Sequence, residues 1–397
     1  MQRMDGEGLT TMAGMTPRER FRAVMNFKKP DRLPWYEWPW NEVIYRWIGE
    51  GLPISAITAQ KEEYDMYGTL PYSISVMVLD VSRYFGFENF SPPEYTVVID
   101  GTCLPRLATK TLEETSDYLI VRSIDGSKKK YTRTETFSMP MWLEWPVKSL
   151  KDWERLKTRL DPTDQRRYPK EWSDDYVEYL RDAQFPVAMW LCGFYAVGRS
   201  YMGTVPFVSA FYKDPELVKD MMDFQATFLV ESARKAVEAL GSSIDIVVIH
   251  EDMSYKHGPH VSPKLFREFI LPGYKKVTSF LRKNGIETIF VDTDGNPIAL
   301  IPLLLEAGVN GLLPLEVAGG VDAVALSKQY GRSLRLIGNI DKRAVAKGKA
   351  EIRKEVESKL PYLKEAGGFI PMVDHVIPPD ISLENFKYYS DQIKRFL

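Results

Sequence analysis

The sequence predicts an α/β protein: a (β/α)8 TIM-type barrel with an inserted antiparallel β-meander. From about residue 145, short apolar runs alternate with amphipathic helical segments, a pattern typical of parallel strands that are buried on both faces. Six such units, with one or two more before residue 95, come close to the eight of a barrel. A doubly wound open sheet is the second interpretation. The apolar runs are 185–191, 244–249, 287–291, 311–315, 334–337 and 368–372, and the helical segments are 148–159, 170–183, 214–240, 262–284, 345–365 and 382–396.

The first ordered element is predicted to be a helix that begins after Thr16. Pro17 then occupies the first helical position, and Glu19, three residues after the cap, completes a capping box. Residues 1–15 are expected to form a flexible tail, and residues 16–397 a single barrel domain.

The segment between this helix and the barrel repeat is harder to assign. Residues 33–38 form an aromatic first strand, helices are plausible at 41–49 and 58–66, and an apolar segment follows at 74–79. Short β-branched and aromatic runs, separated by Asp-Gly turns, then predict the antiparallel insertion at about 95–140.

Composition excludes several classes of protein. The 397 residues are 44% hydrophobic and 27% charged, which is ordinary for a packed globule. The 52 basic and 54 acidic side chains give a net charge of -2, so there is no basic field to attract nucleic acid or anionic lipid. Cys103 and Cys192 are too few for a disulfide framework, and there is neither a signal peptide nor an apolar stretch of membrane-spanning length. We therefore expect a cytoplasmic protein.

Polar side chains follow five successive apolar runs, where the loops of a barrel begin and where its chemistry is located. All five segments bring a carboxylate to what would be the same rim, and the most distant, Asp341, comes four residues after its run ends. All four histidines lie in the same loops. The segments are His250-Glu251-Asp252, Asp292-Thr293-Asp294, Glu316, Gly338-Asn339-Ile340-Asp341 and Asp374-His375, and the remaining histidines are His257 and His260.

Asp292 and Asp294 are the strongest candidates for site residues. Two apart on a strand end, their side chains tend to share a face with Cα atoms ~6.5 Å apart. Two charges at that distance repel by roughly 2.5 kcal/mol at an effective dielectric near 20. A metal ion, a basic side chain, a cationic substrate or a retained proton would offset this repulsion. Asp294 has an alternative role as the cap of the following helix.

The other candidates also have structural alternatives. Glu316 could form a salt bridge within the rim, Asp341 a helix cap or ion cluster, and His375 a hydrogen-bonded core contact. Of residues 250–252 we favour Asp252, because alternation allows at most two of the three to face the mouth. His257 and His260 are expected at the surface of a lid loop.

An aromatic cluster follows the first helix. Trp35, Tyr36, Trp38 and Trp40 could be packing residues or the wall of a pocket for a flat or cationic ligand.

The phosphate-binding, dinucleotide-binding and serine-hydrolase motifs are missing, which argues against a kinase, a nicotinamide dehydrogenase and a serine hydrolase.

As a set, several segments resemble the uroporphyrinogen decarboxylase superfamily, from about residue 15 onward. The superfamily includes the decarboxylase and the methyltransferases that move methyl groups between corrinoid proteins and small acceptors, and its fold is a (β/α)8 barrel. The matching segments are MTPRERFRAVMNFKKPDRLP at the start, GFYAVGRSYMG (193–203), SPKLFREFILPGYKKV (262–277), FVDTDGN (290–296), LIGNID (336–341) and DHVIPPDISLENF (374–386).

The resemblance implies roles for individual residues. Tyr201 is similar to the active-site tyrosine of the decarboxylase, and Asp252 lies at its pocket serine. His375 stands where the decarboxylase has a histidine and the methyltransferases a zinc-binding cysteine. We therefore expect Tyr201, Asp252 and His375 to be catalytic.

At two places the sequence differs from the family pattern, and both differences limit the substrate or metal that the protein could bind. The arginine-rich element that clamps the carboxylates of a tetrapyrrole is replaced by Trp35-Tyr36-Glu37-Trp38-Pro39-Trp40, which disfavours uroporphyrinogen as the substrate. The His-x-Cys zinc pair of the methyltransferases is replaced by Asp292 and Asp294. Together with His375 these would form a harder, oxygen-rich site that suits magnesium, manganese or iron.

The leading functional hypothesis is a methyltransferase that acts on a small substrate, with a corrinoid carried by a partner protein. A divalent metal would be held by Asp292, Asp294 and His375, and the resemblance implies a homodimer. The substrate would be bound by Trp35, Glu37, Trp38, Arg199 and Glu316. The alternatives are a decarboxylase or lyase that places Arg199 or Lys256 beside the departing carboxylate, and a non-catalytic barrel that binds a small cation.

Overall fold

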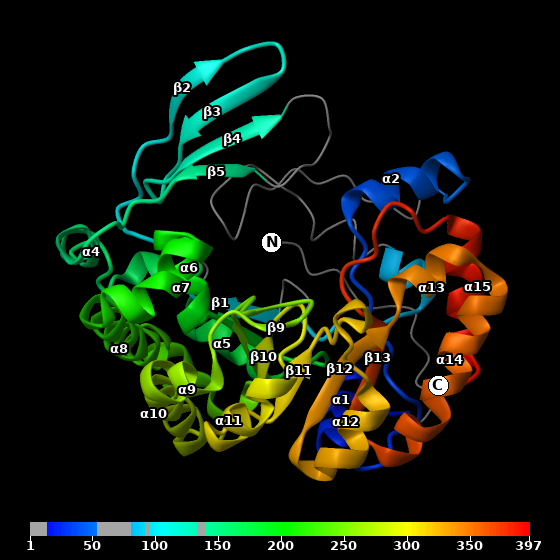
Figure 1. Cartoon of the computed structure of the whole chain (residues 1–397). Helices are drawn as coiled ribbons and strands as arrows, with labels where there is room; N and C mark the ends of the chain where they lie inside the picture. The colour runs from blue at the N-terminus through cyan, green and yellow to red at the C-terminus, as the bar shows by residue number, and fades with distance from the viewer. Residues whose placement is uncertain (1–13, 54–80, 92–94, 133–139, 171) are drawn as a thin grey trace.

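The computed structural model describes residues 14–53, 81–91, 95–132, 140–170 and 172–397. Seven parallel strands form its main sheet, in the order β1-β6-β7-β10-β11-β12-β13 (Figure 1). Their bounds are β1 (Thr96–Val98), β6 (Ala188–Cys192), β7 (Ile246–His250), β10 (Ile289–Asp292), β11 (Gly311–Leu313), β12 (Arg335–Ile340) and β13 (Phe369–Val373).

The predicted first strand continues this sheet beyond β13. The amide of Tyr36 donates to the carbonyl of Pro371 at 3.1 Å, and the amide of Glu88 donates to the carbonyl of Trp35 at 2.8 Å. Parallel bridges join Tyr36 to Glu88 and Pro39 to Ile377. The sheet therefore curves from the last strand back to the N-terminal part of the chain, and the fold is a TIM-type barrel, as predicted.

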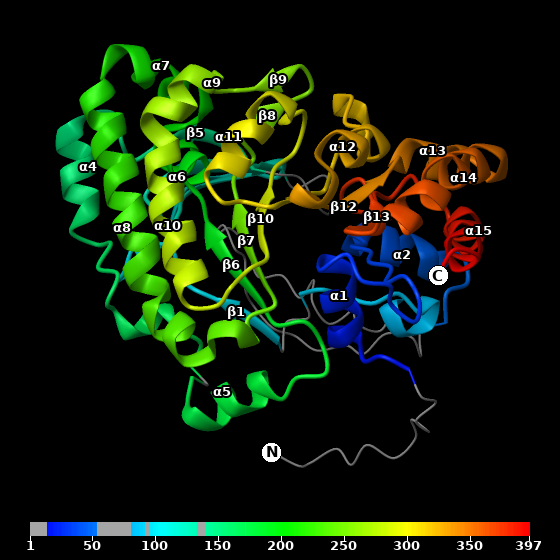
Figure 2. The same ribbon diagram turned by 90° about the horizontal axis from the view of Figure 1, so that it is seen from below.

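Helices surround the sheet, with α8 and α10 on one side and α14 and α15 on the other (Figures 1 and 2). A short π-helical segment, Phe266–Ile270, joins α9 to α10. The helices are α1 (Pro17–Met25), α2 (Asn41–Gly49), α4 (Leu150–Lys157), α5 (Asp174–Arg181), α6 (Phe194–Met202), α7 (Thr204–Lys213), α8 (Pro215–Leu240), α9 (Pro263–Leu265), α10 (Leu271–Lys283), α11 (Ile301–Glu306), α12 (Ala323–Tyr330), α13 (Lys342–Lys347), α14 (Lys349–Ala366) and α15 (Leu383–Lys394).

Two layers of apolar side chains pack on the strands. The inner layer takes alternate strand positions, such as Ile246 and Val248 of β7, and fills the barrel. The outer layer packs against the helices and includes Val247 and Ile249. Helix α1 belongs to the inner layer through Phe21, and it closes the amino-terminal end of the barrel.

Helix α1 begins as predicted. The Thr16 side chain accepts from the amide of Glu19 and the Glu19 carboxylate accepts from the amide of Thr16, a complete capping box. Arg18 Nε binds Asp245 Oδ2 at 2.8 Å just before β7, with both side chains at most 9% exposed. This buried ion pair fixes α1 under the sheet.

The inserted antiparallel sheet has four strands and stands apart from the main sheet at the top of Figure 1. It comprises β2 (Lys110–Glu114), β3 (Tyr118–Arg122), β4 (Lys128–Thr132) and β5 (Met141–Glu144). One expectation was wrong: the run at 96–99 does not belong to the insertion. Residues 96–98 are β1 and pair in parallel with β6.

The predicted helix at 58–66 and the apolar segment at 74–79 lie outside the described residues, as does most of the predicted tail. A two-stranded hairpin, β8 (Ser254–Tyr255) and β9 (Gly258–Pro259), follows β7. In the described part of the chain, none of the helices has the length and apolar character needed to cross a bilayer.

Candidate functional site

The carboxyl ends of neighbouring strands bring charged side chains together, as the barrel predicts. His250 ends β7 and Asp292 ends β10, and the two residues are directly paired in the register of these strands. Because Ile246 and Val248 point into the barrel, alternation turns His250 toward its mouth. We call this end of the barrel the rim.

His250 is the most connected residue of the rim. Its Nδ1 lies 2.9 Å from Asp292 Oδ2, and its Nε2 lies 3.8 Å from Asp252 Oδ2. Burial opposes protonation, but the hydrogen bond that the ring donates to Asp292 and the charges of both aspartates raise the pKa of His250 to about 9. His250 is therefore an imidazolium near neutral pH.

Asp252 extends this network to helix α6. Its Oδ2 lies 2.8 Å from a terminal nitrogen of Arg199, so the carboxylate lies between a guanidinium and an imidazolium. Asp252 has a φ of 49°, a left-handed conformation that is uncommon for residues with a side chain. The predicted candidates Asp252 and Arg199 therefore meet in one ion pair.

His375 and Asp294 form a second histidine–aspartate pair, with 3.2 Å between Nε2 and Oδ1. The pair is more exposed than His250 and Asp292, at 30% and 39% of the side chains against 11% and 17%. Burial opposes ionisation of Asp294, but the charges of His375, Lys342 and His250 hold its pKa below the usual range. The two pairs therefore act on one another electrostatically.

Glu316 follows β11 and completes the rim. Its Oε1 binds Lys342 Nζ at 3.0 Å, and its Oε2 accepts from the amide of Gly295 at 2.9 Å. Asp294 does not cap a helix, since the next helical turn begins at Ile298. Asp341 does cap one: it accepts from the amide of Arg343 at the start of α13.

Trp35 and Glu37 do not face the mouth. Glu37 is buried between the sheet and α15, where its Oε1 accepts from the indole of Trp35 and the hydroxyl of Tyr389, both at 2.6 Å. Tyr36 points into the barrel, so its two neighbours must point outward. The prediction that Trp35 and Glu37 bind substrate is therefore not supported by their positions. Trp38, the third residue of this segment predicted to bind substrate, is 38% exposed.

Tyr201 is a buried residue of α6. It is 6% exposed, its hydroxyl lies 3.8 Å from Cys103 Sγ, and its ring packs near Trp153. Burial raises the pKa of Tyr201 well above the usual value. A catalytic role for Tyr201 stays a prediction.

The three predicted metal ligands lie in two separate ion pairs. Asp292 faces His250, whereas Asp294 faces His375. Within residues 14–53, 81–91, 95–132, 140–170 and 172–397, the structure brings together no group of three or more His, Cys, Asp or Glu side chains arranged to hold a metal. This donor arrangement does not fit the predicted metal, whose presence stays a prediction.

Sequence reasoning placed His250 after its strand but favoured Asp252 over it, and it assigned Lys342 no role at the rim. His250 lies two residues after Val248 and two before Asp252, so the alternation of a strand predicts that all three side chains share one face. Lys342 gave no such signal, because it directly follows the helix cap Asp341 and has the pattern of a residue on a surface helix. His257 is exposed, as expected, but the ring of His260 is stacked between Tyr195 and Tyr255, at centroid distances of 5.6 and 5.2 Å.

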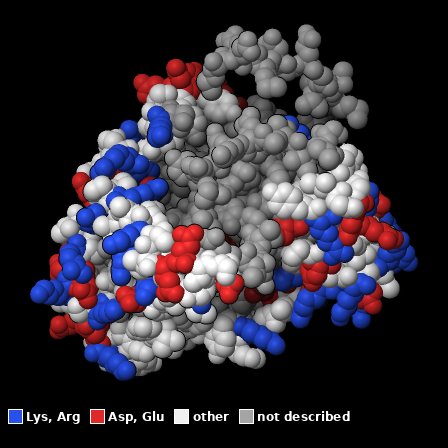
Figure 3. Space-filling model, turned by 90° about the horizontal axis from the view of Figure 1, so that it is seen from above, with Lys and Arg blue, Asp and Glu red and all other residues white. Residues whose placement is uncertain are grey.

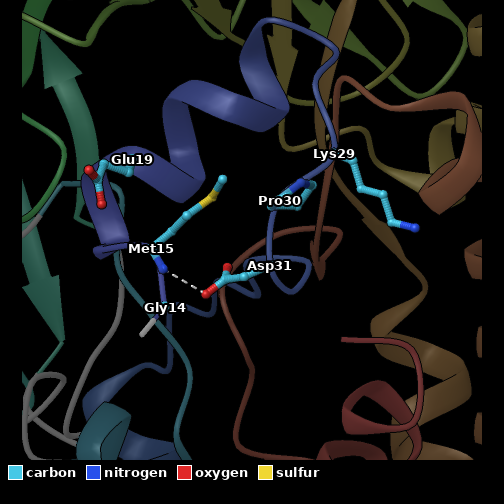
Figure 4. A pocket seen from close by; sticks show the side chains of 6 residues that line it. All are labelled: Gly14, Met15, Glu19, Lys29, Pro30 and Asp31. Carbon is cyan, nitrogen blue, oxygen red and sulfur yellow. Dashed lines mark hydrogen bonds between the residues drawn. The ribbon is translucent and has the colours of Figure 1, made fainter. Parts of the chain in front are cut away.

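Two other surface features lie outside the rim. A pocket of about 610 Å³ beside α1 is lined by Gly14, Met15, Glu19, Lys29, Pro30 and Asp31 (Figure 4). It lies at the amino-terminal end of the barrel, opposite the histidine pairs. On the face in Figure 3, basic and acidic side chains are interspersed, in keeping with the nearly balanced charge of the chain.

Comparison with known proteins places this geometry in a family. A family model described as uroporphyrinogen decarboxylase matches residues 141–396. A methyltransferase from Methanosarcina mazei has a similar structure, with a TM-score of 0.60 and 15% identity over 96% of this chain and 99% of that one. A B12-independent methionine synthase from a Shewanella species gives a TM-score of 0.35 and 15% identity over 55% and 64% of the two chains. No curated protein matches the sequence significantly.

Proposed function

Because the chain belongs to the uroporphyrinogen decarboxylase family, we propose that it is an enzyme of this family, a methyltransferase that acts on a small substrate at the rim. The observation that carries the proposal is the pair of histidine–aspartate contacts, His250–Asp292 and His375–Asp294, at the carboxyl end of the sheet. The first joins the neighbouring strands β7 and β10, and the second joins the segments that follow β10 and β13. In TIM-barrel enzymes this end of the strands holds the reacting groups.

The residues of this chain would bind and orient the acceptor and move its proton. His375 is the more accessible histidine, and Asp294 orients its ring, so His375 is the candidate for proton transfer with the acceptor. Arg199 and Asp252 would fix the other end of the substrate. A corrinoid held by a partner protein would supply the methyl group, and no step is assigned to a metal.

Methyl transfer can be tested with methylcobalamin as the donor and small thiols, amines and carboxylates as acceptors. We expect loss of the methylcobalamin absorbance together with a methylated acceptor in the mass spectrum. His375→Gln should reduce the rate at least roughly a hundredfold, because a general acid–base contributes that much. Arg267→Gln, in the exposed Arg267–Glu306 pair, is the matched control and should keep the rate.

The alternative reactions have their own outcomes. Release of carbon dioxide from a small acid, without methyl transfer, would favour the decarboxylase. Turnover of uroporphyrinogen would contradict the argument from the missing arginine clamp. Ligand binding without either reaction would favour a non-catalytic barrel, although Trp35 and Glu37 do not form the cation-binding wall first expected.

A further inference from the structure

The charges of the rim are balanced, with four basic and four acidic side chains. Four contacts of 3.2 Å or less each join one basic to one acidic side chain, on segments that follow six neighbouring strands, and His250 also lies 3.8 Å from Asp252. The pairs are Arg199–Asp252 at 2.8 Å, His250–Asp292 at 2.9 Å, His375–Asp294 at 3.2 Å and Lys342–Glu316 at 3.0 Å. Every side chain in these pairs is between 11% and 39% exposed, so each is partly desolvated and still reachable from solvent.

Such a rim discriminates between ligands by charge. A pure anion adds one uncompensated negative charge to this balanced set, and a pure cation adds one uncompensated positive charge. An unpaired charge in a partly buried position is costly. A ligand that carries both charges can enter one ion pair and replace it with two, so that every charge keeps a partner.

We propose that the substrate is a small zwitterion, with its carboxylate on Arg199 and its cationic group on Asp252. This inference rests on the proposed function, because it assumes that the rim is the substrate site. The guanidinium of Arg199 has the planar fork that recognises a carboxylate. Asp252 has a φ of 49°, and its carboxylate also lies 3.8 Å from His250 Nε2, a contact that does not depend on the pair with Arg199.

An aromatic stack sets one boundary of the subsite. His260 lies between the rings of Tyr195 and Tyr255, with interplanar angles of 4° and 24°. Tyr195 lies one helical turn before Arg199 in α6, and Tyr255 lies three residues after Asp252, so the stack is close to the Arg199–Asp252 pair. Burial and the charge of Arg199 lower the pKa of His260.

Calorimetric titration with three series of matched chain length tests the inference: ω-amino acids, alkylamines and alkanoates. The amino acids should bind wild-type protein at least roughly tenfold more tightly than the matched amine and acid. In Arg199→Met the amino acid should fall to the affinity of the amine, and in Asp252→Asn to that of the acid. Asn is chosen because it tolerates the left-handed backbone.

The controls separate this inference from the proposed reaction. Arg267→Gln should bind all three series as the wild type does, and circular dichroism checks that each variant is folded. Equal binding of the amine or the acid, or no binding by any series, would overturn the inference. Binding of zwitterions without methyl transfer would contradict only the proposed reaction. Methyl transfer to an acceptor with a single charge or none would contradict only the inference that the substrate is a zwitterion.

Discussion

Asn339 is a buried residue that holds the loop of Glu316 in place at the rim. Its Oδ1 accepts from the amide of Ala323 at 3.0 Å, and its Nδ2 donates to the carbonyls of Leu315 and Val321, both at 2.9 Å. These bonds hold both ends of the loop that carries Glu316. The φ of Asn339 is 67°, a conformation that Asn adopts more readily than most residues.

We predict that Asn339→Ala destabilises the protein by about 3 to 5 kcal/mol, because three bonds are lost and the buried amide of Ala323 is left unpaired. Urea unfolding measures this loss. Asn339→Gly loses the same bonds but relieves the left-handed backbone, so it should be about 1 kcal/mol more stable than Asn339→Ala. Equal stability of the two variants would show that the backbone conformation is unimportant here.

At the scale of the element, Glu251 fixes the start of α6. The amides of Phe194 and Ala196 donate to its two carboxylate oxygens at 2.9 and 3.0 Å, and the hydroxyl of Tyr274 donates to Oε1 at 2.6 Å. A Cβ on Gly193 would lie 2.2 Å from the Glu251 carboxyl carbon, so this close approach requires glycine. Helix α6, which carries Arg199, is thereby attached to β7.

We expect Gly193→Ala and Glu251→Ala each to destabilise the fold by about 2 to 4 kcal/mol, the first by steric conflict and the second by unpaired buried amides. In the double variant the added methyl group meets no carboxylate, so its cost should be clearly less than the sum. A double-mutant cycle from denaturant unfolding tests this coupling. Additive costs would mean that the methyl group is accommodated elsewhere.

The elements that the sequence predicts well are those whose pattern is local. Apolar runs gave six of the strands to within a few residues, and the position after each run predicted Asp292, Asp294, Glu316 and His375 at one rim. The partners of these residues depend on how the segments after the strands turn across the end of the barrel, and the pattern of apolar runs does not contain that information. Asp294 and His375, for example, follow β10 and β13, which are not adjacent in the sheet. The pairing of Asp292 with His250 and of Asp294 with His375 therefore required the structure.

The orientation of the first strand shows a different limit. The aromatic run around Tyr36 is apolar on both faces, so alternation alone does not decide which face is inside. In the structure Tyr36 fills the barrel, and Trp35 and Glu37 turn toward α15. A carboxylate next to tryptophans suggested a ligand pocket, but two of its three partners, Val373 and Tyr389, are more than 330 positions away in the chain.

At the scale of the whole molecule, Glu37 ties the two ends of the chain together. Besides Trp35 and Tyr389, its carboxylate accepts from the amide of Val373 in β13 at 3.2 Å, so one side chain joins the first strand, the last strand and the last helix. Burial raises the pKa of Glu37 to about 8, against the effect of its three donors. The folded protein therefore binds a proton here that the unfolded chain releases above about pH 4.5.

This proton makes stability depend on pH. Because the folded pKa is raised, the contribution is complete below the unfolded value and is lost as pH rises through the folded value, by about 1.4 kcal/mol per pH unit between them. Glu37→Gln cannot ionise, so its stability relative to wild type should improve by roughly 3 to 5 kcal/mol from about pH 5 to pH 8. Urea unfolding across this range provides the measurement, and Glu384→Gln on the exposed side of α15 should follow the wild type. A constant difference between Glu37→Gln and wild type would mean that Glu37 is ionised in the fold, and that its three donors outweigh its burial.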